Sequence, residues 1–147
     1  PHSVARADVA RGAQPGHHRG WGADRARPVG TGRVFHVARP DRRELVKLLV
    51  DSGSLYTWVS GALLRELGVG PSERRRVLTI EGRTTERGAA EIMITLEGRT
   101  LHTLCLFGQP GDLEVLGAYT LEGFGLAIDP VQRRLIPAIL YGAVAVV

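Results

Sequence analysis

The chain has 147 residues, of which 44% are apolar and 23% are charged. This balance indicates one soluble globular domain and excludes fibrous and largely disordered proteins. The formal net charge is +4, but part of the basic charge lies in the first thirty residues and no basic helix or aromatic platform follows, so we expect no nucleic-acid binding. Because no apolar run approaches the roughly 18 residues of a membrane span and no secretory signal is found, we expect a cytoplasmic protein without a membrane segment.

Residues 1–30 contain glycine, proline and scattered charge without a period of 2 or 3.6 residues, which predicts a flexible basic extension. The folded domain is then expected over residues 31–147. Cys105 is the only cysteine, so neither an intrachain disulfide nor a cysteine cluster for zinc can form, and we expect it at a buried strand position. We also expect no metal and no cofactor, since the histidines of the extension are more often solvated; these are His2, His17 and His18.

Two strands are predicted after the extension, over residues 34–37 and 44–50, with a turn at Pro40 and Asp41 between them. The second strand ends in three aliphatic residues, and the next residue is Asp51. A buried aliphatic run of this kind is normally followed by a residue with no chemical role. Here it delivers a carboxylate to a turn.

The turn consists of Asp51, Ser52, Gly53 and Ser54. Gly53 permits backbone angles that a side chain would forbid, and the two serine hydroxyls can bond the carboxylate or the nearby backbone. Such a turn would hold the carboxylate still. An aspartate, a serine and a glycine after a strand are also common in ordinary turns, so the tripeptide alone does not define a site.

After the turn, residues 55–59 are rich in aromatic and β-branched side chains, which predicts a strand. Ser60 is the expected N-cap of a short helix that ends before Gly68. One face of this helix is apolar, formed by Leu63, Leu64 and Leu67.

Segments 77–80, 84–96 and 101–107 follow, and the last two alternate apolar and polar residues, so we predict a meander of antiparallel strands. Each of its two connections contains the same three residue types around a glycine that can take a positive φ. The first tip is Glu81, Gly82 and Arg83, preceded by Ile80, and the second is Glu97, Gly98 and Arg99.

A second unit of strand, glycine and helix begins with the apolar pair Val115 and Leu116, followed by Gly117. Thr120 is the expected cap of a single helical turn. This unit repeats the order seen at residues 48–68, but without an acid at its turn.

Residues 126–128 and 134–136 are then predicted to pair across a turn. Residues 138–147 are almost wholly apolar, and we expect this tail to pair with another surface, a second chain being one candidate.

Taken together, residues 30–137 resemble the retropepsin-like aspartic proteases, particularly the small bacterial members. Asp51 to Ser54 resemble the family's catalytic loop, Ile80 to Arg83 fall where its flap hairpin lies, and Val115 to Gly117 resemble its glycine motif before a helix. The resemblance implies a mainly β fold, a closed barrel of antiparallel strands with one or two short helices and one lobe per chain. Ala118 replaces the arginine of retroviral members, so their interface salt bridge is not carried over.

The resemblance also implies an aspartic endopeptidase. Hydrolysis by this route needs two carboxyl groups about 3 Å apart that share one proton. The sequence has a single turn of this type, at Asp51, so we predict a homodimer in which two copies of Asp51 meet at a two-fold axis, with residues 138–147 pairing at the interface. The substrate would be an extended peptide under two flaps.

Two other readings of the sequence remain. The same fold could dimerise or bind peptides without cutting them. A small β-barrel could instead bind a ligand or nucleic acid through its basic extension.

Overall fold

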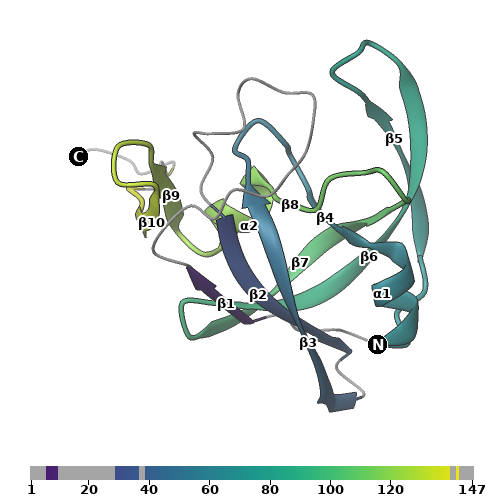
Figure 1. Ribbon diagram of the computed structural model, residues 1–147, viewed down its shortest axis with the longest axis horizontal. Helices are drawn as coiled ribbons and strands as arrows, with labels where there is room; N and C mark the ends of the chain where they lie inside the picture. The colour runs from purple at the N-terminus through teal and green to yellow at the C-terminus, as the bar shows by residue number, and fades with distance from the viewer. Residues whose placement is uncertain (1–5, 10–28, 37–38, 140–141, 143–147) are drawn as a thin grey trace.

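The computed structural model describes the backbone of residues 6–9, 29–36, 39–139 and 142, and the side chains of residues 44–139 and 142. These residues form a mainly β structure with two short helices, as predicted (Figure 1). The helices are α1 (Gly61–Glu66) and α2 (Ala118–Gly123). The strands are β1 (Arg6–Val9), β2 (Val29–His36), β3 (Arg39–Val50), β4 (Thr57–Ser60), β5 (Glu73–Leu78), β6 (Thr84–Leu96), β7 (Arg99–Gly108), β8 (Val115–Leu116), β9 (Leu126–Asp129) and β10 (Arg134–Pro137).

Within the described residues, eight strands form one sheet in the order β1-β2-β3-β8-β4-β7-β6-β5, and β9 pairs with β10. Strand β6 also pairs with β2 and β1. The pairs β3–β8 and β4–β7 are parallel, which corrects the prediction of antiparallel strands throughout. Parallel strands need a long crossover, and the chain reaches β7 from β4 only after α1 and the β5–β6 hairpin, which strand patterns alone do not reveal.

Both predicted hairpin tips are confirmed. Between β6 and β7, Glu97 and Gly98 have φ angles of 50° and 76°, the left-handed pair that suits a two-residue connection. Gly82 has a φ of 78° between β5 and β6. That tip is wider than expected, because β5 ends at Leu78 and the loop includes Ile80.

The core lies against the inward faces of β3, β6 and β7 and is closed by the helices. The alternation in β6 places Ile92, Ile94 and Leu96 at 0% exposure. Cys105 is also fully buried, as predicted. The Ser60 hydroxyl accepts a hydrogen bond from the amide of Leu63 at 3.3 Å, which confirms the expected cap of α1.

Several predicted boundaries differ from the structure. Pro40 and Asp41, expected in a turn, lie at the start of β3, where a proline does not interrupt the central ladder. Residues 55 and 56 belong to the loop after β3, and β4 begins only at Thr57. Thr120 lies inside α2, which begins at Ala118 after Gly117.

Within the predicted extension, residues 6–9 form β1, which pairs with β2 and β6, and β2 begins at Val29. The extension is therefore paired with the sheet at these two places. Its remaining residues, including the three histidines, lie outside the described residues, as does most of the apolar tail of residues 138–147.

Candidate active site

Asp51 follows the buried end of β3. Leu48 and Val50 are each 1% exposed, whereas Asp51 itself is half-buried. Strand β8 lies parallel to this end, with Leu49 opposite Val115 and Val50 opposite Leu116. The last rung of this ladder is the hydrogen bond from the Asp51 amide to the Leu116 carbonyl, at 3.0 Å. The backbone of Asp51 is therefore attached to the second strand-glycine-helix unit.

The residues after Asp51 fold back on its carboxylate. The Gly53 amide donates to Oδ1 of Asp51 at 2.9 Å, and the Ser54 amide donates to its carbonyl at 3.1 Å. The predicted reason for Gly53 is not found, because its φ is not positive; a Cβ atom at this position would instead make a tight contact of 3.1 Å with Oδ1 of Asp51. The glycine therefore allows the backbone to approach the carboxylate closely.

Of the two serines, Ser54 bonds to the backbone, as expected, since its hydroxyl donates to the Tyr56 carbonyl at 2.9 Å. Ser52 is exposed, and its hydroxyl makes no hydrogen bond within the described residues.

The acid loop, residues 51–56, also provides the N-terminal cap of α2. The amides of Ala118 and Tyr119 donate to the carbonyls of Ser54 and Leu55 at 2.8 and 2.9 Å. The first amides of a helix have no partner inside the helix, and here the loop satisfies two of them. The bonds hold both segments in place, because the loop cannot move without exposing the start of α2.

Gly117 makes this contact sterically possible. A Cβ atom at this position would lie 2.4 Å from the carbonyl carbon and oxygen of Tyr56 and 2.9 Å from the Ser54 carbonyl oxygen. All three are backbone atoms, which cannot turn aside as a side chain can. The structure thus brings together two segments that the sequence singled out, Asp51 to Ser54 and Val115 to Gly117.

Three threonines also support this junction, of which the sequence pattern had suggested a role only for Thr120, as a helix cap. Thr57 accepts a hydrogen bond from the Gly117 amide at 3.1 Å, and its hydroxyl lies 2.6 Å from that of Thr120. The Thr120 hydroxyl lies 2.7 Å from that of Thr103. All three side chains are buried. Threonines on strands are common, and the sequence contains no signal that these three meet.

The predicted flap residues, Ile80 to Arg83, are not joined to Asp51 by any hydrogen bond among the described residues. The tip is closed by its own bonds, from the Thr79 amide to the Arg83 carbonyl at 2.8 Å and from the Gly82 amide to the Thr79 carbonyl at 2.9 Å. Leu78 and Ile80 are 75% and 78% exposed. In Figure 1 the hairpin formed by β5 and the start of β6 extends away from the body of the sheet.

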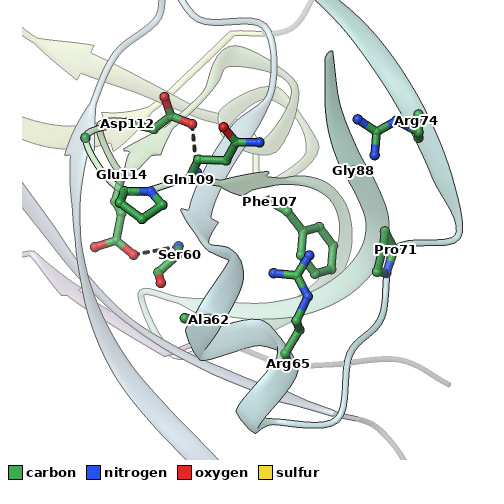
Figure 2. Close-up of a pocket in the computed structure, with 13 residues that line it drawn as sticks. Ser60, Ala62, Arg65, Pro71, Arg74, Gly88, Phe107, Gln109, Asp112 and Glu114 are labelled. Carbon is green, nitrogen blue, oxygen red and sulfur yellow. Dashed lines mark hydrogen bonds between the residues drawn. The ribbon is translucent and has the colours of Figure 1, made fainter. Parts of the chain in front are cut away.

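A hollow of about 270 Å³ adjoins the acid loop. Its walls include Tyr56, Tyr119 and Arg75, and Arg75 donates a hydrogen bond to the Tyr56 hydroxyl at 2.7 Å. A larger hollow of about 400 Å³ lies between α1, the β5–β6 hairpin and the turn before β8 (Figure 2). Its walls include Arg65, Phe107 and Glu114. Asp51 lines neither of these hollows, so a single chain does not enclose its carboxylate in either of them.

Arg87 and Asp112 join the hairpin strand β6 to the turn before β8. The guanidinium donates to both carboxylate oxygens of Asp112, at 2.7 and 3.0 Å. This pairing lowers the pKa of the Asp112 carboxyl and raises the pKa of Arg87. Elsewhere, burial raises the pKa of the Cys105 thiol, which favours its protonated, less reactive form.

Among the described residues, no three His, Cys, Asp or Glu side chains lie together in a way that could hold a metal ion. In the same part of the chain, neither helix has the length and apolar character that crossing a membrane requires.

No known family model matches the chain, and no curated protein matches it. Among solved structures, it is similar to the protease of Simian Foamy Virus (mac), determined in solution. The two chains are 24% identical, and the match covers 53% of this chain and 84% of the viral protein with a TM-score of 0.39. At this level of likeness, no site residue or assembly is carried over from that protein.

Proposed function

We propose that this chain is one half of a retropepsin-like aspartic endopeptidase, completed when two copies meet about a two-fold axis. The observation that supports the proposal is the acid loop. A half-buried carboxylate follows a buried strand and accepts the Gly53 amide. The backbone of its loop is held by hydrogen bonds to the backbone of Leu116, Ala118 and Tyr119. A carboxylate that must act as an acid or a base needs this kind of fixed support.

The proposed reaction divides the work between two copies of Asp51. The ionised carboxylate takes a proton from a water molecule, and the resulting hydroxide attacks the carbonyl carbon of the peptide bond. The protonated carboxyl of the partner subunit polarises that carbonyl. A proton then passes to the amide nitrogen as the C–N bond breaks, and the products are a carboxylic acid and an amine. Two carboxyls this close share a single proton, which supplies one acid and one base at mildly acidic pH.

The substrate proposed is a peptide in extended conformation. The β5–β6 hairpin, with Leu78 and Ile80 exposed at its end, would cover it as a flap, and the hollow beside Tyr56 and Tyr119 would receive one of its side chains. The pairing of β6 with β2 in addition to β7 supports a sheet that closes into a barrel within each subunit. The apolar residues 138–147 are proposed to pair at the dimer interface.

The test compares two substitutions of the same chemical type. Asp51→Asn keeps the oxygen that accepts the Gly53 amide but cannot cycle a proton, so peptide cleavage at mildly acidic pH should fall by about a thousandfold, with folding and dimerisation preserved. Asp129→Asn is the control, because Asp129 uses one carboxylate oxygen to accept the Val131 and Gln132 amides in the turn between β9 and β10, outside the acid loop.

Cleavage of a peptide library, its block by a pepstatin-type inhibitor, and its loss in Asp51→Asn alone would support the proposal. Equal activity in wild-type protein and Asp51→Asn would remove Asp51 from the mechanism. A wild-type dimer that binds peptides without cutting them would instead favour a catalytically silent module of the same fold.

A further inference from the structure

The three buried threonines form a continuous chain of hydroxyl groups between three elements. Thr57 lies on β4, Thr103 on β7 and Thr120 on α2, and their exposures are 0%, 3% and 1%. The Oγ1 atoms of Thr57 and Thr120 are 2.6 Å apart, and those of Thr120 and Thr103 are 2.7 Å apart. A hydroxyl removed from water is costly unless it is bonded, and here each one has a partner.

The chain of hydroxyls ends at the junction that holds the acid loop. Thr57 accepts the Gly117 amide at 3.1 Å, and Gly117 lies against the Ser54 and Tyr56 carbonyls. The next two amides, those of Ala118 and Tyr119, donate to the loop. A displacement of Gly117 would therefore reach the loop directly through its immediate neighbours.

Packing alone does not explain these threonines, since valine has nearly the same shape and would fill the same space without a polar atom. What valine cannot do is accept the buried Gly117 amide or join α2 to β4 and β7 by directional bonds. We infer that Thr57, Thr103 and Thr120 are positioning residues that fix the Asp51 loop in its working geometry. The consequence for catalysis rests on the proposed function, whereas the consequence for the loop does not.

The first measurement follows the loop itself, by amide hydrogen exchange in the full chain. Thr57→Val leaves the Gly117 amide without its acceptor and does not alter the groups that bond to Ala118 and Tyr119. We expect the Ala118 and Tyr119 amides to exchange about tenfold faster, relative to core amides of β6, because an unpaired buried donor favours opening of this junction.

A matched control exists elsewhere in the same sheet. Thr95 on β6 and Thr100 on β7 also place their Oγ1 atoms 2.6 Å apart, and Thr95 is 6% exposed. Neither bonds to the acid loop or to α2. Thr100 is exposed and can bond to water in place of Thr95, so Thr95→Val should lower global stability less than Thr57→Val does and should leave the Ala118 and Tyr119 amides protected relative to the core.

The second measurement separates positioning from binding. In an active enzyme, Thr57→Val should lower kcat about tenfold with little change in KM, and it should shift the acid limb of the pH profile, because the two carboxyls no longer meet in the same geometry. Thr57→Ser, which keeps the hydroxyl, should restore most of kcat. A chain without peptidase activity would sink the proposed function but would leave the exchange measurement as a test of positioning.

The inference is contradicted if Thr57→Val and Thr95→Val speed exchange at Ala118 and Tyr119 equally, since the threonines would then support only the fold. If Thr57→Val does not fold, Thr120→Val replaces it, because that change leaves the Gly117 bond in place and removes the centre of the chain. Selective exchange at the junction supports the inference, and uniform exchange overturns it.

Discussion

Two glycine-containing loops, the acid loop (residues 51–56) and the β5–β6 tip (residues 79–83), are held in opposite ways. The acid loop bonds to residues about sixty positions away, through Leu116, Ala118 and Tyr119. The tip bonds only to itself among the described residues, and its one large apolar side chain, Ile80, is exposed. Local opening depends on such contacts, so the first loop should be among the most protected parts of the molecule and the second among the least. The proposed chemistry requires a fixed acid and a movable cover, and this difference between the two loops is consistent with both roles.

The largest expected effect is at Gly117, where a side chain would disturb the contact between the acid loop and α2. In Gly117→Ala the new methyl group would lie 2.4 Å from the backbone of Tyr56, so either the loop or α2 must move. We expect a loss of about 3 kcal/mol in the free energy of unfolding, measured by urea denaturation, together with loss of any cleavage.

Gly123→Ala is the control for that change, because Gly123 lies in the same helix with no atom within 4 Å of the new methyl group. It should raise stability by about 0.5 kcal/mol through a less flexible unfolded chain. Equal effects at the two positions would contradict the close approach of Gly117 to the loop.

The base of the hairpin can be loosened through Asp112. Arg87 lowers the pKa of Asp112 in the folded protein. The pair therefore stabilises the fold at pH values above the unfolded-state pKa of about 4. This contribution is lost as the pH falls through the lower pKa of the folded state. Asp112→Asn should therefore lower the free energy of unfolding by about 1 kcal/mol at neutral pH. Below about pH 4, the free energy of unfolding of the variant should fall less steeply with pH than that of the wild type.

The measurement for Asp112 is urea unfolding at several pH values, with Asp129→Asn as the control. An unchanged pH dependence in Asp112→Asn would mean that the ion pair does not form in solution.

The most local effect is expected at the tip. Gly82 has a φ of 78° with open space around it, so Gly82→Ala costs about 1 kcal/mol of backbone strain and no clash. Since the tip is not bonded to the acid loop, amide exchange at Ala118 and Tyr119 should be unchanged. Faster exchange there would show that the two loops are coupled within one chain.

Much of the site's framework could be predicted because it depends on local patterns. Two such patterns predicted a strand that ends in a glycine-containing turn. One is the aliphatic run before Asp51 and Gly53, and the other is the apolar pair before Gly117. The tips at Gly82 and Gly98 were predictable for the same reason, since a positive φ has a clear sequence signature.

What could not be predicted depends on contacts between distant segments. The β propensity of Leu55 and Tyr56 suggested a strand, but their carbonyls face Gly117 and the start of α2. Thr120 looked like a helix cap, yet the loop carbonyls cap α2 and leave its hydroxyl for the buried chain with Thr57 and Thr103. No pattern within one segment contains this information.

The central claim is that each active site takes one acid from each of two chains. Co-expression of wild-type and Asp51→Asn chains in equal amounts tests it directly, because random pairing leaves only about a quarter of the dimers with two intact acids. We predict that specific cleavage activity falls to about a quarter of the wild-type value. A fall to only half would mean that each chain works alone, and it would contradict the shared site.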